Sequence, residues 1–425
     1  MTSVGEAHSR ARRVLGKFFV KSRLDTMAVT MAVEVDRFAD LIFEPELQRS
    51  SARSPTSEEE TKQPAEDSDS ASAEIDMQEF FGLVTLQLFC KLQLSFDVFA
   101  FGTAPGTVGW DASRVRTAGE IARTCCDAIS YGSNVIGEHM LYNIPLTRAL
   151  PRVRRVEADI KTFRSELLDP LIAHRKAELS ADRVRTREEE APAVPEDCLT
   201  ALLGADYSEP EIRDQLVTLI GAGHDTTSFF SCYAALMLAK HPDVQEAVRR
   251  ELCSATFDSD FCWATSLLKR VVQETLRLYP VIPMVTRVTA HATSLPDGRG
   301  GRLELPAKTR VLVPFFLINR LPEIYGDDAA RFDPDRWLES NQATKSDGIT
   351  NSKQGFLPFG HGSRTCVGYS LALIEMRVIF QRILARYDLH EIPGFAPTIK
   401  AGVSLTVVNP KGIKVRIVRR TTQQR

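Results

Sequence analysis

A long uninterrupted helical signal, from Ser208 to about Lys240, constrains this chain more than any other feature. Ser208 and Glu211 form a capping box, and Pro210 occupies the first turn, where its missing N–H does no harm. Pro242 marks the other end. About 31 residues at 1.5 Å each span roughly 45 Å, which is long enough to cross a whole domain. The signal therefore favours one large, helix-rich domain.

Other segments add to this picture. A central stretch of short apolar runs and turns, residues 281–315, predicts short strands. Apolar spacing and bounding prolines predict further helices within residues 1–45 and over 77–102, 158–179, 242–252, 266–278 and 366–387. We therefore expect a mainly α fold with a minor β part, forming a single domain over residues 1–425.

One segment does not fit a packed core. Residues 49–76 contain almost no large apolar residue and are rich in Ser and Glu. Such a composition cannot bury enough apolar surface to fold. We interpret it as a disordered, acidic insertion within the domain.

Composition excludes several classes of protein. The 425 residues carry 53 Lys and Arg against 55 Asp and Glu, so the net charge of −2 gives no general attraction to nucleic acid. Eight scattered cysteines without a CxxC pair favour reduced thiols over a secreted disulfide scaffold. No window of eighteen apolar residues is present, so we expect no transmembrane segment.

The segment FGHGSRTCVG, residues 359–368, carries the strongest chemical signal. Cys366 stands at the predicted start of a helix, where the helix dipole and free N–H groups stabilise a thiolate. Arg364 can pair with a carboxylate, and the glycines allow a flat ligand to approach the backbone. A thiolate here suits an axial ligand of haem iron. A buried, inert cysteine is the simpler reading of a lone Cys, but several positions match together.

This segment matches FxxGxRxCxG, and the chain resembles the cytochrome P450 family. The resemblance implies that haem b lies between the long helix and this loop, with Cys366 as the axial ligand of the iron. Further contacts to the cofactor are implied for Phe359, Gly360, Arg364, Gly368 and Ala222.

A second family pattern, AGHDTT at residues 222–227, lies in the long helix. The resemblance implies that Asp225 and Thr226 are an acid–alcohol pair that relays protons to iron-bound dioxygen. A polar helix face with Thr bonded to its own preceding turn is the alternative for DTT in isolation. We assign His224 no role.

Two further sets of residues match the family. Glu274 and Arg277, in QETLR, share a helix face and resemble the pair that binds a downstream arginine, here Arg336 in FDPDRW; this implies a structural role. For the haem propionates the resemblance implies Arg364, Arg287, Arg12 and His8, which stands where the family usually has Trp. A solvated basic face is the alternative for Arg12 and its neighbours.

The helix with Arg12 begins almost at residue 1, whereas family members carry an anchor and further elements before it. We therefore expect an N-terminally truncated form. The resemblance places family members on the cytosolic face of the endoplasmic reticulum. This chain, without a transmembrane segment, would then be cytosolic or peripheral.

The resemblance implies a monooxygenase that uses dioxygen and takes electrons from NADPH through a flavoprotein reductase. Residues 281–285 and 401–407 match substrate-lining positions and are apolar, which suggests a lipophilic small molecule. Arg10, Arg13 and Lys17 suit either a reductase-facing side or a solvated face. Two alternatives stay open: a haem-thiolate isomerase or dehydratase, and a non-catalytic haem-binding fragment.

Overall fold

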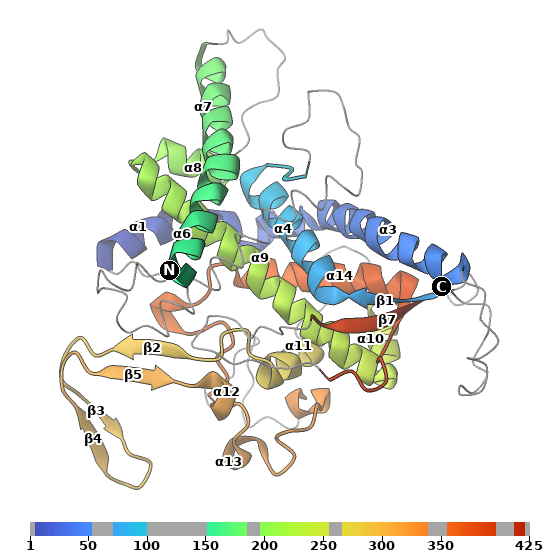
Figure 1. The fold of residues 1–425 in the computed structure, drawn as a ribbon. Coiled ribbons are helices and arrows are strands. Elements are labelled where there is room, and N and C mark those ends of the chain that lie inside the picture. Colours follow the sequence, from blue (N-terminus) through green and yellow to red (C-terminus); the bar gives the residue numbers. More distant parts are fainter. Residues whose placement is uncertain are drawn as a thin grey trace.

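We analysed a computed structural model of the chain. It describes residues 5–52, 71–99, 151–184, 196–254, 266–338, 355–396 and 412–420. Residues 401–407 therefore lie outside the described residues. Most of the described chain is helical, as the sequence predicts, and small sheets complete it (Figure 1).

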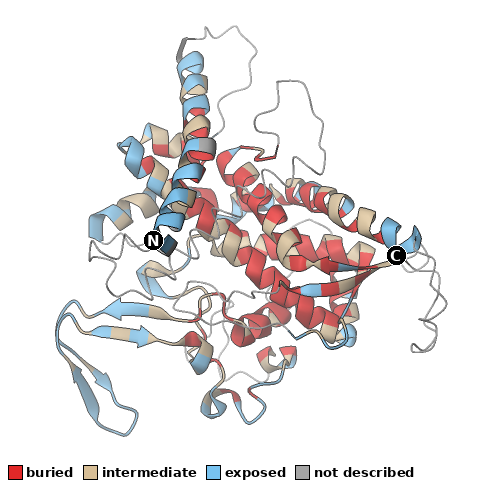
Figure 2. Cartoon of the chain, in the orientation of Figure 1, coloured by how far each residue is buried: buried red, intermediate tan, exposed pale blue. Residues whose placement is uncertain are grey.

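The predicted long helix is present as α9 (Glu209–Lys240) and crosses the molecule diagonally (Figure 1). Its capping box forms as expected, because the backbone N–H of Ser208 donates to the Glu211 carboxylate at 2.8 Å. The C-terminal half of α9 is buried on nearly every side (Figure 2). This helix is therefore the axis around which the core is built.

Three apolar helices pack around α9: α4 (Met77–Leu94), α11 (Leu267–Leu278) and α14 (Tyr369–Arg386). The packing of α4 is close at Gly223, where a Cβ atom would collide with the ring of Phe89. Gly223 thus allows the close packing of α4 on α9. Helices α3 (Ala28–Ala52) and α10 (Pro242–Ser254) cover the outer side of α14.

Shorter helical elements complete the described chain. At the N-terminal end they are α1 (Gly5–Leu15), η1 (Gly16–Phe19) and α2 (Lys21–Asp25). A long projecting arm contains α6 (Pro151–Phe163), the short π-helix η3 (Arg164–Leu168) and α7 (Asp169–Val184) (Figure 1). Helix α8 (Cys198–Gly204) follows this arm. The remaining elements are α12 (Phe315–Ile318), α13 (Pro322–Tyr325), η5 (Pro334–Trp337) and η8 (Gly362–Arg364).

The largest sheet joins distant parts of the chain. Strand β7 (Lys414–Arg419) lies between β1 (Ser72–Asp76) and β6 (Tyr387–His390), and both pairs are antiparallel. Ile75 pairs with Val415, so a strand near residue 75 is fixed by one near the C-terminus. The sheet therefore closes the fold beside α4 and α14.

The predicted strands of residues 281–315 form two exposed hairpin-like sheets. Strand β2 (Val285–Val288) pairs with β5 (Arg310–Val313), and β3 (Thr293–Pro296) pairs with β4 (Arg302–Leu305). They project away from the helical core and are largely exposed (Figures 1 and 2). Among the described residues, no helix is both long and apolar enough to cross a membrane.

The structure corrects three boundaries. The segment predicted as a disordered insertion, residues 49–76, is ordered at both ends: α3 runs to Ala52, and residues 72–76 form β1. Residues 53–70 lie outside the described residues. The helix predicted over 77–102 ends at Leu94, because Ser95 adopts a left-handed conformation with φ of 49°. Pairing with β7 explains why a polar segment can form β1.

Candidate functional site

The predicted cysteine loop is tightly hydrogen-bonded. The backbone N–H of Cys366 donates to the carbonyl oxygen of Phe359 at 2.8 Å, which closes the loop. Gly360 has φ of 72°, a left-handed conformation that favours glycine, and a Cβ there would lie 3.5 Å from the Arg364 carbonyl oxygen. The Phe359 ring packs edge-on against Tyr369, with centroids 4.8 Å apart. The loop thus holds the cysteine in one defined place.

Cys366 itself precedes the helix. Helix α14 begins at Tyr369, three residues later, with Gly368 as its N-cap. Desolvation raises the pKa of the Cys366 thiol, and the backbone N–H of Gly368 and the charge of Arg12 lower it by less. Cys366 is exposed at the surface and lies three residues before α14, so the predicted position at the helix start is wrong, and the thiolate stays a prediction. A metal ion deprotonates a thiol that coordinates it, so a bound ion would stabilise the thiolate form of Cys366 without help from the helix.

Helix α1 lies against this loop at Arg12. Arg12 donates from Nη1 to the carbonyl oxygen of Thr365 at 2.6 Å. The pKa of His8 is lowered by burial, and further by the nearby positive charges of Arg364 and Arg12. Three basic side chains from two distant segments therefore gather beside Cys366. The two guanidinium groups favour an anionic ligand between them, and such a ligand would in turn favour the protonated form of His8.

The remaining basic candidates lie elsewhere. Arg287 is exposed on β2 and donates to the carbonyl oxygen of Thr286 at 3.0 Å, and no described contact joins it to the cysteine loop. Arg10 stacks over the Tyr207 ring, 3.8 Å from its centroid. Lys17 forms an exposed ion pair with Glu196 at 3.3 Å. Arg10 and Lys17 are thus engaged with this chain's own residues.

The polar segment of α9 divides into two sides. Ala222, Asp225 and Thr226 are half-buried, whereas His224 and Thr227 are buried. The Thr226 hydroxyl donates to the Ala222 carbonyl oxygen at 2.8 Å. Backbone bonding of this kind was the alternative to a relay, and in this state of the protein the hydroxyl adopts it.

Glu274, Arg277 and Arg336 come together, as the family resemblance implies. Glu274 and Arg277 are fully buried and form a bidentate pair at 2.7 and 2.8 Å. Arg336 reaches the same carboxylate at 3.5 Å, and the Trp337 indole N–H donates to it at 2.9 Å. Arg277 also donates to the carbonyl oxygens of Asn319, Ala329 and Arg331. This network ties α11 to η5 and to the loop before it.

One buried titratable residue escaped the sequence analysis. Glu375 lies on α14 with a fully buried side chain, among positions interpreted only as apolar. A single acidic residue inside the apolar run LALIEMRVIF was the available signal. It lies close enough to Thr227 of α9 for the hydroxyl to affect its pKa.

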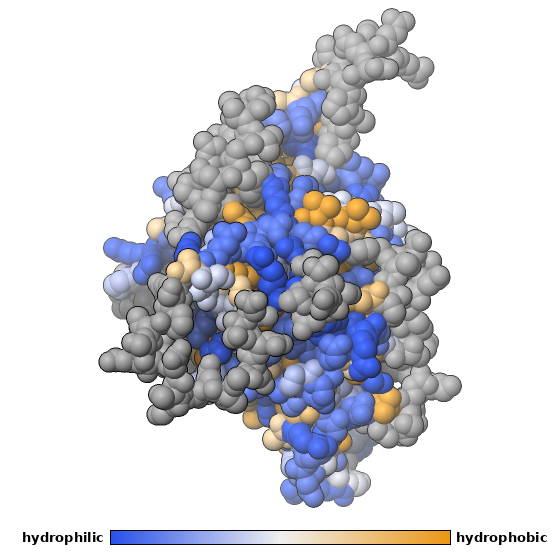
Figure 3. All heavy atoms as spheres, turned by 90° about the vertical axis from the view of Figure 1, so that its right-hand side faces the viewer, coloured by the Kyte–Doolittle hydropathy of each residue, from blue (hydrophilic) through white to orange (hydrophobic). Residues whose placement is uncertain are grey.

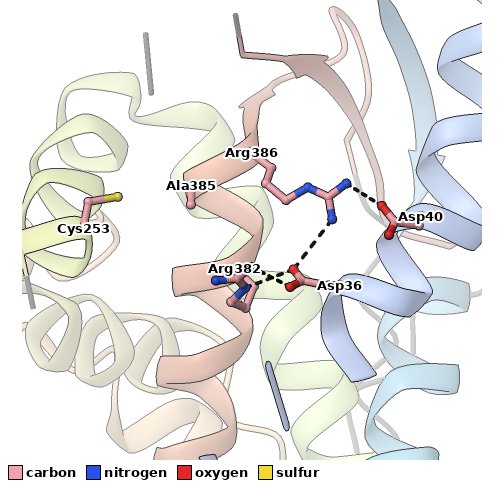
Figure 4. Close-up of a pocket in the computed structure, with 6 residues that line it drawn as sticks. All are labelled: Asp36, Asp40, Cys253, Arg382, Ala385 and Arg386. Carbon is pink, nitrogen blue, oxygen red and sulfur yellow. Dashed lines mark hydrogen bonds and ion pairs between the residues drawn. The ribbon is translucent and has the colours of Figure 1, made fainter. Parts of the chain in front are cut away.

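A surface hollow of about 490 Å³ lies apart from these residues, between α3, α10 and the end of α14 (Figure 4). Arg382 donates to Asp36 at 2.5 and 3.0 Å, and Arg386 donates to Asp40 at 2.5 Å. Cys253 lies on the opposite side from these acids. Because the charges that line the hollow satisfy one another, it does not require a ligand.

Hydrophilic residues predominate among the described residues on the face of the molecule that Figure 3 shows.

The donor set at Cys366 fits haem. No group of three or more His, Cys, Asp or Glu side chains that could hold a metal ion occurs in the described part of the chain. A single thiolate suits an iron whose other ligands come from a porphyrin. The basic cluster of His8, Arg12 and Arg364 suits the carboxylates of the same cofactor. The residues present are therefore compatible with haem.

Comparison with known proteins gives an independent result. The sequence model of the family "Cytochrome P450" matches residues 58–417. Cytochrome P450 52-N1 of Starmerella bombicola is 33% identical over 219 residues, which are 48% of this chain and 41% of that protein. LUTEIN DEFICIENT 5, chloroplastic, of Arabidopsis thaliana is 26% identical over 357 residues, covering 82% of this chain and 56% of that protein.

Further comparisons concern length and fold. Alkane hydroxylase MAH1 of Arabidopsis thaliana is 27% identical over 271 residues, covering 60% of this chain and 51% of that protein. The chain thus spans about half the length of the curated relatives it matches. A crystal structure of a cytochrome P450, CYP102L1, superposes with a TM-score of 0.68 at 21% identity, covering 99% of this chain and 83% of that one. That likeness concerns the fold alone.

Proposed function

The chain belongs to the cytochrome P450 family, and from this premise we propose that it is a haem-thiolate monooxygenase. The observation that carries the proposal is the cysteine loop with α1 against it. Cys366 is held by the Phe359 carbonyl, and Arg12 is bonded to the neighbouring Thr365. A thiol ligand and basic groups for carboxylates are thus gathered from segments about 350 residues apart in the sequence.

In this proposal each residue has a limited task. Cys366 would ligate the haem iron, and Arg12, Arg364 and His8 would bind the haem carboxylates. Haem, when bound, supplies the iron centre that activates dioxygen. The glycines of the loop allow a flat group to approach the backbone. Arg287 stays a further candidate for a carboxylate contact.

Proton handling is assigned to α9. Thr226 Oγ1 is the atom proposed to hold and pass a proton, with Asp225 beside it. Its hydroxyl donates to Ala222 in the described structure, so it must turn away from that carbonyl to donate elsewhere. The half-buried position of Thr226 leaves room for such a rotation.

Substrate, redox partner and location are proposed more broadly. We expect a lipophilic small molecule, because residues 281–285, which follow α11, are apolar and buried or half-buried. Electrons are proposed to come from NADPH through a flavoprotein reductase. The endoplasmic reticulum surface is the proposed location, although one relative is named as chloroplastic.

The test is the carbon monoxide difference spectrum of the chain expressed with haem and reduced with dithionite. We expect the red-shifted Soret band of thiolate-ligated haem, and we expect Cys366→Ala to abolish it. Cys253→Ala, at an exposed cysteine on α10, is the matched control and should keep the band.

Each alternative has a distinct outcome. A spectrum of free or histidine-ligated haem would contradict the proposed function. A correct spectrum without NADPH-dependent product formation would favour the non-catalytic haem-binding fragment. Product formed without dioxygen consumption would favour the isomerase or dehydratase.

A further inference from the structure

A buried carboxylic acid links α14 to the polar segment of α9. The Glu375 side chain is fully buried, and among the described residues neither of its oxygens has a hydrogen-bond partner. Its neighbours one turn away on the same helix, Leu371 and Ile379, are buried and apolar. An unpaired carboxylate in such surroundings would be strongly unfavourable, so the group avoids ionisation by keeping a proton.

The ionisation properties of Glu375 agree with this geometry. Burial raises its pKa to about 8, and the hydroxyl of Thr227 acts in the opposite direction. Charged side chains on the neighbouring elements form ion pairs of their own: Asp36 with Arg382, Asp40 with Arg386, Glu246 with Arg249, Asp388 with Arg420, Lys17 with Glu196, and Lys21 with Asp25. On α14 itself, Arg377 interacts electrostatically with Asp25 of α2. On α9 itself, the His224 ring lies toward Gly82 of α4. Thr227 is therefore the polar group through which Glu375 acts on α9.

Thr227 stands between Glu375 and the proposed relay. Its hydroxyl donates to the Gly223 carbonyl oxygen over a long 3.4 Å, whereas Thr226 donates to Ala222 at 2.8 Å. A hydroxyl has one proton to donate, and an ionised carboxylate is a stronger acceptor than a carbonyl. While Glu375 is neutral, the Thr227 hydroxyl keeps its hydrogen bond to the Gly223 carbonyl oxygen. An ionised Glu375 would accept that hydrogen bond instead and draw the hydroxyl away from the α9 backbone.

We propose that Glu375 is a positioning residue that stores a proton between α14 and α9 and thereby keeps the Thr227 hydroxyl on its own helix, beside Asp225 and Thr226. This inference rests on the proposed function, because it assigns Glu375 to the relay segment. Ionisation of Glu375 would release Thr227 from Gly223 and disturb the turn that carries Thr226. Proton relay should therefore fail as Glu375 ionises.

The test uses the haem-loaded chain and infrared spectroscopy across a pH titration. We expect the carbonyl stretch of a protonated carboxyl group, present at neutral pH and lost with a midpoint near pH 8. Glu375→Gln should remove that band, and Glu323→Gln, at an exposed residue of α13, should keep it. Thr227→Val should move the midpoint upward, because the hydroxyl favours the ionised form.

A second readout addresses the relay. In the wild type, the fraction of consumed NADPH that yields product should fall as pH rises through the infrared midpoint. In Glu375→Gln this fraction should not change over that range, because the amide cannot ionise. A merely structural role would alter the total activity without flattening this profile.

Each failure is distinguishable. A band that titrates in the ordinary carboxyl range, or a Thr227→Val midpoint that stays in place, would overturn the inference. A profile that Glu375→Gln does not flatten would also overturn it. Loss of the thiolate carbon monoxide band in the same wild-type sample would instead overturn the proposed function.

Discussion

Two fully buried glutamates, Glu274 and Glu375, lie in opposite environments. The carboxylate of Glu274 accepts hydrogen bonds from Arg277, Arg336, Trp337 and the backbone N–H of Asp333. The carboxyl group of Glu375 accepts none from the described residues. Arginine side chains and N–H donors thus stabilise the charged form of Glu274, whereas Glu375 is stabilised in its neutral form by keeping a proton.

This difference separates a structural acid from one that can respond to pH. Glu274 joins α11 to η5 through a network that includes three carbonyl acceptors of Arg277. Removing one member of such a network leaves the others buried and unpaired. Glu375 belongs to no such network, so a change in its protonation would act on α9 only through the hydrogen bond of Thr227 to Gly223. The two positions should therefore respond differently to the same substitution.

The largest effect is expected for Glu274→Gln. The amide cannot neutralise Arg277 or Arg336, so buried positive charge stays uncompensated. We expect a loss of about 3–5 kcal/mol in the free energy of unfolding at every pH between 5 and about 8. Denaturant unfolding of the haem-loaded chain measures it, with Glu323→Gln as the exposed control. A neutral result would mean that the network contributes little to stability.

Glu375→Gln should act in the opposite direction and depend on pH. The folded pKa of Glu375 is raised to about 8 from an ordinary value of 4.5. The folded state therefore binds the proton more tightly, and the stability of the wild type falls as pH rises between these two values. The variant should gain about 1.4 kcal/mol relative to wild type for each pH unit in this window, and almost nothing below it.

Denaturant unfolding at pH 5, 6, 7 and about 8 measures this gain. Destabilisation by Glu375→Gln that is equal at every pH would break the comparison, because both glutamates would then be ordinary structural acids.

A smaller effect is expected for Trp337→Phe. The substitution removes the indole N–H that donates to Glu274 at 2.9 Å but keeps a ring next to Phe356. One hydrogen bond to a charged acceptor is worth about 2 kcal/mol. We expect a loss of that size in the free energy of unfolding, with an unchanged carbon monoxide spectrum. A loss as large as that of Glu274→Gln would mean that Trp337 matters chiefly through packing.

The sequence was informative where local chemistry decides structure. The cap at Ser208 and the stop at Pro242 placed α9 correctly, because both act within a few residues. The shared helix face of Glu274 and Arg277 followed from their spacing, and the family resemblance added Arg336 to the network that the structure forms. The juxtaposition of Arg12 with the cysteine loop was also anticipated, through the likeness of α1 to a family pattern.

The sequence predictions failed where contacts with distant parts of the chain determine the structure. Strand β1 was interpreted as part of a disordered segment, because the residues that order it lie more than 300 positions away in β7. Arg12, whose charge lowers the pKa of the exposed Cys366 thiol, comes from a segment about 350 residues away in the sequence. Glu375 was missed for the same reason, since its meaning comes from Thr227 on another helix.

The β1–β7 pairing also bears on how this protein is made. During synthesis, residues 72–76 leave the ribosome long before residues 414–419, their partners. At about 5–20 residues per second, β1 waits on the order of tens of seconds without its neighbour. Contacts of such high sequence separation are slow to form, and unpaired strands can pair wrongly in the meantime. Emergence of residues 414–419 is therefore the step that allows β1 to take its place in the sheet.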